Sequence, residues 1–297
     1  MTIFDPSLIA RAYGFLAARP RAVLAGAALY AAPFTVQSWA TAMAASGAGW
    51  APPLVIGFGL LAFAAFVCAI AGWGAALLGG GDAGPRFGKD ALRLGWVAVL
   101  ILILIFTVLG TALLAVVFML AALALINVDA SVEPPQGFVD IFALYGPGET
   151  AVAVVISAVY ALFSVWFFSR LALAYPATVA AGRIRVLNAW PLSGRGRAVE
   201  IVLTVLAATL PGAAALWALN AGFAAAAGFY PAAAQSAVTE QGVLMMNAAF
   251  FMMSAFVYGM FKMALVGAPL AAALVALYVK YSKDDANSAS APQTGGD

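Results

Sequence analysis

The residues of this sequence that are best suited to binding a ligand are arginines, gathered between residues 170 and 200. The set consists of five arginines and one tryptophan: Arg170, Arg183, Arg185, Trp190, Arg195 and Arg197. A guanidinium group can hold phosphate oxygens through two parallel hydrogen bonds, and tryptophan favours the interface between lipid headgroups and hydrocarbon. The pattern therefore predicts contact with the headgroups of anionic membrane lipids. Plain anchoring of a membrane protein uses the same residue types, and the sequence alone favours that simpler interpretation.

Residues suited to catalysis or metal binding are scarce. The sequence has no histidine, which removes the commonest general base and the commonest metal ligand. The single cysteine, Cys68, lies in an apolar stretch and is expected to be a small buried side chain. Ser157 and Tyr160 are one helical turn apart, but neither has a basic neighbour to activate it. We therefore expect no enzyme activity, no catalytic residue, no cofactor and no metal.

The composition is that of an integral membrane protein. Hydrophobic residues make up 65% of the chain and charged residues only 9%, and the mean hydropathy is +1.02. A soluble domain carries about 25% charged residues, so this chain could not cover a soluble surface of its size. We therefore predict an all-α, polytopic transmembrane helical bundle with amphipathic helices on the cytoplasmic surface.

Apolar stretches of about 20 residues predict about six membrane spans. They cover residues 22–45, 54–78, 94–126, 150–169, 201–228 and about 262–280. We expect residues 1–281 to form a single membrane domain. The polar residues 282–297 are expected to be a disordered cytoplasmic tail.

Two of these stretches leave alternatives open. The run 94–126 is about 50 Å long as a helix, so it must tilt, project beyond the membrane or break near Gly110. The run 243–279 could be two spans meeting at Lys262, or one span. One span is preferred because it keeps both basic ends at interfaces. Residues 243–261 would then be an outer extension or an interfacial helix, with Lys262 at the outer interface. A ligand or ion site at Lys262 near the bilayer centre is the alternative.

The distribution of charge predicts the orientation. Thirteen of the fourteen basic residues fall on one side of the predicted membrane, and Lys262 is the exception. Lysine and arginine mark the cytoplasmic side, so both termini are expected there. The first 21 residues predict an amphipathic surface helix with Asp5 as its N-cap. Its apolar side chains at helical spacing form two rows: Leu8, Ala12 and Phe15, and Ile9, Tyr13 and Leu16.

Two strings in the arginine-rich segment resemble a known family. They are Ser-Arg-Leu-Ala-Leu-Ala-Tyr-Pro-Ala at 169–177 and Asn-Ala-Trp-Pro-Leu-Ser-Gly-Arg-Gly at 188–196. They are similar to a signature of the YciC-like bacterial inner-membrane proteins and of the membrane domains attached to some glycerophosphodiester phosphodiesterases. Pro191 departs from that signature. The resemblance implies a bacterial inner-membrane location and a role in the cell envelope. It does not carry over phosphodiesterase activity, because the soluble domain of those enzymes has no counterpart in this chain.

We expect a non-catalytic accessory or scaffold protein of the inner membrane. The expected partners are membrane lipids with anionic headgroups on the cytoplasmic face, and not nucleic acid. A transporter or lipid-handling permease is the alternative. A polar cavity near helix breaks at Pro33, Gly110 and Pro211 would favour transport. A solid bundle packed with Ala, Leu and Phe would favour a scaffold.

Overall fold

The computed structural model describes residues 4–79, 81–125, 145–194 and 196–290. Within these ranges the regular elements are all helices, which confirms the predicted all-α class. The α-helices are α1 (Pro6–Ala18), α2 (Pro20–Ala45), α3 (Ala51–Leu77), α4 (Lys89–Leu104), α5 (Gly110–Leu125), α7 (Pro147–Leu171), α8 (Ala174–Ala181), α9 (Ala198–Ala227), α10 (Ala248–Lys262) and α11 (Ala268–Ser290). Two π-helical segments, η1 (Ile105–Leu109) and η4 (Met263–Gly267), and two 3₁₀ segments, η2 (Leu187–Ser193) and η3 (Ala234–Ala237), complete the chain.

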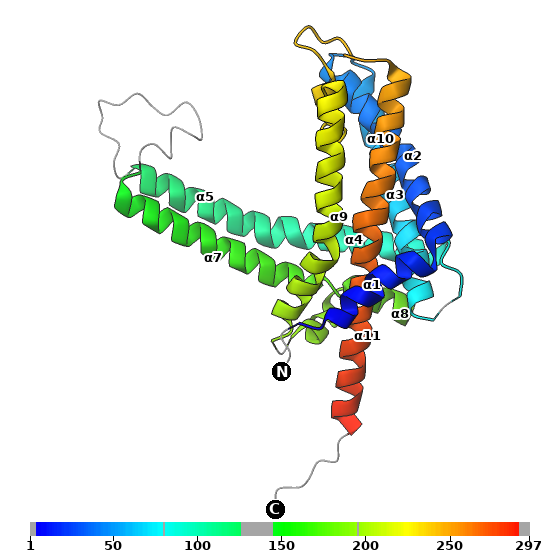
Figure 1. The fold of residues 1–297 in the computed structure, drawn as a ribbon. Helices are drawn as coiled ribbons and strands as arrows, with labels where there is room; N and C mark the ends of the chain where they lie inside the picture. Colours follow the sequence, from blue (N-terminus) through cyan, green and yellow to red (C-terminus); the bar gives the residue numbers. More distant parts are fainter. Residues whose placement is uncertain (1–3, 80, 126–144, 195, 291–297) are drawn as a thin grey trace, which may run out of the picture.

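Four helical runs lie side by side and form what we term the bundle (Figure 1). They are α2, α3, α9 and the continuous run α10–η4–α11. Small residues bring these helices close together, since a β-carbon on Gly26 would lie 2.7 Å from the Trp73 ring. The Trp73 indole donates a hydrogen bond of 3.3 Å to the carbonyl of Ala22. The core between these helices consists mainly of alanine around Trp73 and Met263.

A helical hairpin, which we term the arm, projects sideways from the bundle (Figure 1). It consists of the run α4–η1–α5 and of α7, which returns alongside α5. Tyr160 donates a hydrogen bond of 3.3 Å to the carbonyl of Leu109 and so links the two sides of the hairpin. Only 11% of the most apolar stretch of each arm run is buried, whereas the figure for α10–η4–α11 is 56%.

The helix α1 crosses one end of the bundle, which we term the base (Figure 1). Asp5 caps the helix by accepting a hydrogen bond of 3.0 Å from the backbone N–H of Ser7, and this confirms the predicted start. The predicted apolar face is also confirmed: Leu8, Ala12 and Phe15 are buried, and the second predicted row is partly buried beside them. They pack mainly against α11 and α9. The Tyr13 hydroxyl donates to the carbonyl of Ala208 at 3.0 Å and fixes α1 on α9.

Among the described residues, five helical runs are long and apolar enough to cross a membrane, against about six predicted. They cover residues 51–77, 89–123, 147–181, 198–227 and 248–286. The remaining predicted span is the helix α2, which ends at Ala45 as predicted, begins two residues earlier than predicted and has a sufficient length of 26 residues. Polar side chains such as Gln37, Ser38 and Thr41 make it less apolar than the other five.

A separate interfacial helix before Lys262 is not present, while an outer extension of the last span stays a prediction. Residues 248–286 form one uninterrupted helical run, and its first part, α10, packs along α2. Lys262 therefore lies in the middle of a helix and not at its end. The π-helical turn η4 accommodates the irregularity at this point without breaking the helix. In the same way, η1 immediately precedes Gly110 and lets the long arm helix continue.

The end of α11 differs from the predicted boundary of the membrane domain. The helix continues to Ser290, so it includes residues 282–290 of the segment expected to be a disordered tail. An ion pair of 2.9 Å between Arg197 and Asp285 ties this extension to α9. Residues 291–297 of the predicted tail lie outside the described residues.

Candidate functional site

The arginine-rich segment lies where the arm meets the bundle. It begins at the last turn of α7, passes through α8 and η2, and ends at the first turn of α9. Its apolar side chains join a core formed by residues from the arm, from α1 and from the base of α9 and α11. Leu173, Ala174 and Ala189 are fully buried there. The segment therefore holds the arm and the bundle together at one point.

Arg170 and Trp190 are brought together at the end of α7. The guanidinium carbon of Arg170 lies 5.3 Å from the ring centroid of Trp166 and 6.0 Å from that of Trp190. Trp190 also meets the rings of Trp166 and Phe167 edge to face, at centroid distances of 5.9 and 6.1 Å. A cation over an indole face gains about 0.5–2 kcal/mol, depending on how far it is removed from water. Trp190 thus contributes to a cation–aromatic cluster at the root of the arm, where α7 ends.

A hydroxyl group holds the backbone around this cluster. Ser193 is fully buried, and its hydroxyl can donate to the carbonyl of Trp190 at 2.9 Å or to that of Arg170 at 3.2 Å. The Nε atom of Arg170 is buried and has no hydrogen-bond partner among the described atoms. A buried donor of this kind usually finds an acceptor, so water or an anionic group is expected to reach it.

Arg197 points into the protein at the base of the bundle. Its guanidinium donates 3.0 Å and 2.9 Å hydrogen bonds to the Leu192 carbonyl and the Asp285 carboxylate, respectively. It also stacks over the Tyr281 ring, 4.4 Å from the centroid. Only 12% of the Arg197 side chain is exposed, so this group joins α9 to α11 and is poorly placed to meet a lipid headgroup.

Near Arg197, the carboxylate of Glu200 on α9 links α9 to α11 and, through Lys280, to α1. Glu200 accepts a hydrogen bond from the Lys280 ammonium and another, of 2.8 Å, from the Tyr281 hydroxyl. The Lys280 ammonium also lies 3.8 Å from the carboxylate of Asp5, the N-cap of α1. We term these six residues the base network: Asp5, Arg197, Glu200, Lys280, Tyr281 and Asp285.

The carboxylate of Asp5 is kept in its charged form by its surroundings. Hydrogen bonds from the side chain and backbone of Ser7 lower the pKa of Asp5, and the positive charges of Lys280 and Arg11 act in the same direction. A charged Asp5 suits both of its structural roles, because a carboxylate caps a helix N-terminus well and attracts the Lys280 ammonium.

The other predicted residues remain nearer the surface. Arg183 is exposed, and Arg185 is partly buried with its backbone N–H bonded to the Thr178 hydroxyl at 3.0 Å. The Nε atom of Arg185 is buried and, like that of Arg170, has no partner among the described atoms. Arg195 lies outside the described residues. The predicted set is therefore not one continuous patch. Of its five described members, Arg170, Trp190 and Arg197 make contacts within the protein, Arg185 is partly buried and only Arg183 is exposed.

Sequence reasoning missed the acidic half of the base network. Glu200 is an isolated acid in a strongly basic segment, and Asp284 and Asp285 follow the last basic cluster. An acid among cations at one end of a bundle is a signal for internal ion pairing. That signal was available in the sequence, but the identity of each partner depends on how α9 and α11 meet.

The site contains no cluster of potential metal ligands. Within the described ranges, no group of three or more Cys, Asp or Glu side chains is placed to hold an ion. Cys68 is buried in an apolar cluster with Val67, Ala71 and Leu94, which matches its prediction as a small core side chain.

Comparison with known proteins gives no match for this chain among family models, curated proteins or solved structures. The resemblance to the YciC-like proteins therefore stays a prediction.

Proposed function

We propose that this chain is a non-catalytic accessory or scaffold protein of the bacterial inner membrane. The observation that carries the proposal is the arm. Its helices are anchored at the junction, yet only 11% of the residues in the most apolar stretch of each run are buried within the protein. Among its outward side chains, Phe106 and Leu162 are each about 70% exposed. A rigid apolar hairpin held clear of its own bundle is suited to packing against helices of another membrane protein.

The orientation that we propose places the base, and with it both termini, in the cytoplasm. Basic side chains gather at this end of the bundle. Arg19 at the start of α2 donates a 2.7 Å hydrogen bond to the carbonyl of Gly81 beyond α3. Lys280 and Arg197 of the base network lie at the same end. The opposite end is closed by uncharged contacts, such as that between Gly242 and the carbonyl of Ser46. Basic residues stay on the cytoplasmic side, which supports this orientation.

Photo-crosslinking in intact membranes tests the role of the arm. A photoactivatable residue would replace Leu114 in α5 or Leu162 in α7, both of which are exposed on the arm. Leu24, on the bundle and 52% exposed, is the matched control. We expect one discrete protein adduct of the same mass from both arm positions and none from Leu24. Adducts with lipid alone at all three positions would contradict the proposal.

A transporter or lipid-handling permease is the second candidate, and irregular helices in the middle of the bundle favour it. Pro211 and Gly212 of α9 lie against η4, where a β-carbon on Gly212 would collide with the carbonyl of Leu265. Pro33 of α2 precedes Phe34, whose ring lies 5.4 Å from the Lys262 ammonium. Two of the three predicted breaks thus meet η4 and Lys262, while Gly110 lies in the arm.

Reconstitution of the purified full chain into liposomes separates the two candidates. A scaffold is expected to leave the rate of fluorescent-lipid movement between leaflets equal to that of protein-free liposomes. A clear acceleration that is lost in Lys262→Gln but retained in Lys283→Gln would favour the permease and overturn the scaffold. Lys283 is exposed beyond the base, so it controls for loss of a charge alone.

A further inference from the structure

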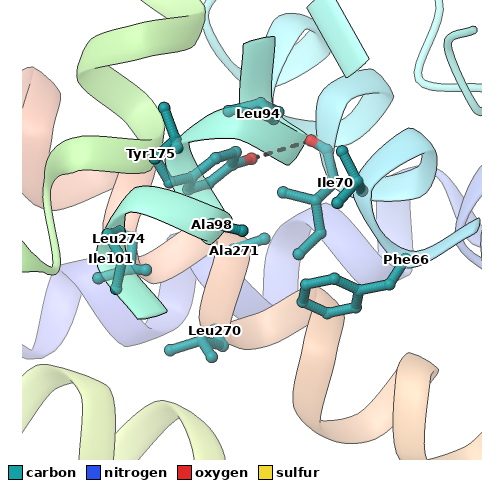
Figure 2. Close-up of a pocket in the computed structure, with 11 residues that line it drawn as sticks. Phe66, Ile70, Leu94, Ala98, Ile101, Tyr175, Leu270, Ala271 and Leu274 are labelled. Atoms are coloured by element: carbon teal, nitrogen blue, oxygen red, sulfur yellow. Dashed lines mark hydrogen bonds between the residues drawn. The ribbon is translucent and has the colours of Figure 1, made fainter. Parts of the chain in front are cut away.

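A cavity of about 180 Å³ lies between α3, α4, α8 and α11 (Figure 2). It is partly enclosed, and its walls are almost entirely carbon. The side chains that shape it are Phe66 and Ile70 of α3, Leu94, Ala98 and Ile101 of α4, and Leu274 of α11. The cavity is therefore built by the bundle and by the root of the arm together.

The one polar side chain shown at the cavity, that of Tyr175, already has a hydrogen-bond partner. The Tyr175 hydroxyl donates a hydrogen bond of 3.0 Å to the carbonyl of Ile70, as the dashed line in Figure 2 marks. A cavity of about 150 Å³ with aliphatic and aromatic walls stays dry and accepts an apolar guest. The occupant of this cavity must therefore present a hydrocarbon surface to it.

Three cationic side chains lie on, or directly after, helices that line the cavity. Lys89 and Arg93 precede the lining residues on α4, and Arg183 follows α8. The start of α4 and the turn after α8 approach each other, because Arg93 Nη1 lies 3.7 Å from the position of a β-carbon on Gly182, the residue before Arg183. Lys89 and Arg183 are exposed, and Arg93 forms an ion pair of 3.0 Å with the exposed Asp90. An exposed pair of this kind is worth at most about 1 kcal/mol, so an anionic group can compete for Arg93.

An apolar cavity with cations nearby matches an amphiphile that has a hydrocarbon chain and an anionic headgroup. We propose that the cavity binds an acyl chain of an anionic phospholipid, with the headgroup phosphate at Lys89, Arg93 and Arg183. This site does not depend on the scaffold role of the arm, and either proposal can fail alone.

Native mass spectrometry of the purified full chain in detergent tests the site. The probes are dioleoyl phosphatidylglycerol, which is anionic, and dioleoyl phosphatidylcholine, which has the same chains and no net charge. We expect one tightly bound phosphatidylglycerol and a preference over phosphatidylcholine of about fivefold or more.

Ala98→Phe fills the cavity and is expected to weaken phosphatidylglycerol binding about tenfold, as when two methylene groups lose their burial. Leu100→Phe is the matched control, because Leu100 lies on the same helix, does not line the cavity and is 37% exposed. It should bind like the wild type. The combined change Lys89→Gln, Arg93→Gln and Arg183→Gln should remove the preference for phosphatidylglycerol while leaving the cavity intact.

A photoreactive acyl probe keeps the test decisive if Ala98→Phe fails to fold. The crosslinks of phosphatidylglycerol with a diazirine near the chain end should map in the wild type to Phe66, Leu270 or Leu274, which line the cavity. Crosslinks confined to the arm would overturn the proposal. Wild-type binding by folded Ala98→Phe would also overturn it, as would equal binding of the two phospholipids by the wild type.

Discussion

The bundle and the arm are both built from apolar helices, but they bury them differently. In the bundle, glycine and alanine let helices approach closely, and Gly259 sits against Ala31 and Phe34. In the arm, α5 and α7 pack on each other, and the hairpin exposes side chains such as Phe118 and Val154. Hydropathy alone would describe both regions as membrane spans. The difference teaches that small residues, rather than apolar content, identify the helices that form a core.

Polar contacts separate the two regions in the same way. The bundle ends in the base network, where Glu200 connects to Lys280 and Tyr281. The arm has no such network along its described length and is held at its root by the cluster of Arg170, Trp166 and Trp190. A region fixed at one end and apolar over the rest of its length is suited to meeting an external surface.

The largest effect is expected where the bundle is tightest. Gly212→Ala should lower the free energy of unfolding by about 3 kcal/mol, because the added methyl group would meet the backbone carbonyl of Leu265 in η4. Gly222→Ala in the same helix is the control, since nothing lies within 4 Å of its β-carbon position. Thermal unfolding in detergent measures both. Equal stabilities of the two variants would show that α9 does not approach η4 as closely as the structure has it.

A smaller loss is expected at the base network. Glu200→Gln removes a charged partner of Lys280 and Tyr281 and should cost about 2 kcal/mol. Glu240→Gln, an exposed acid at the opposite end of the bundle, should change stability by less than about 0.5 kcal/mol. The free energies of unfolding of the two variants would be compared in the same detergent. A neutral Glu200→Gln would mean that α1, α9 and α11 are held by apolar packing alone.

The smallest effect is expected in the arm. The double change Leu114→Ala and Leu162→Ala removes side chains that are 56% and 71% exposed. It should alter the stability of the purified protein by less than about 0.5 kcal/mol, because exposed positions contribute little. By contrast, Leu8→Ala, at a side chain only 1% exposed, should cost about 3 kcal/mol. Equal losses at the two sites would mean that the arm is a second core and not a free surface.

Much of the fold could be predicted because it depends on local patterns. Long apolar runs gave the helices, and Asp5 followed by Pro6 gave the start of α1. The spacing of Leu8, Ala12 and Phe15 identified the buried face of that helix. These features depend on residues that are near one another in the chain, so they can be recognised without a three-dimensional arrangement.

The arrangement of the helices could not be predicted in this way. An apolar run indicates how long a helix is but not the direction in which it runs. The sideways course of the arm therefore could not be predicted from residues 94–126. Lys262 was expected at a helix end because a charge usually marks an interface. The prediction did not include a π-helical turn that carries the helix past it.

The candidate site was predicted only in part, since arginine can serve either a lipid or a protein carboxylate. Arg170 and Trp190 proved to be neighbours, but Arg197 turned inward to Asp285, 88 positions away in the chain. Such a pairing depends on how α9 and α11 meet, and no short motif encodes it. The cavity beside Tyr175 depends in the same way on four separate helices.

The π-helical turn η4 sets the angular register of one helix between two different neighbours. Above it, α10 packs mainly along α2, and below it, α11 meets α1 and α9. One residue is worth about 100° of rotation around a helix, so the wider turn decides which side chains face α9 further along. Lys280 and Tyr281 lie about 25 Å beyond Met263. The π-helical turn in the middle of the bundle thus aligns Lys280 and Tyr281 with the rest of the base network. A perfectly regular helix would turn those two side chains away from Glu200.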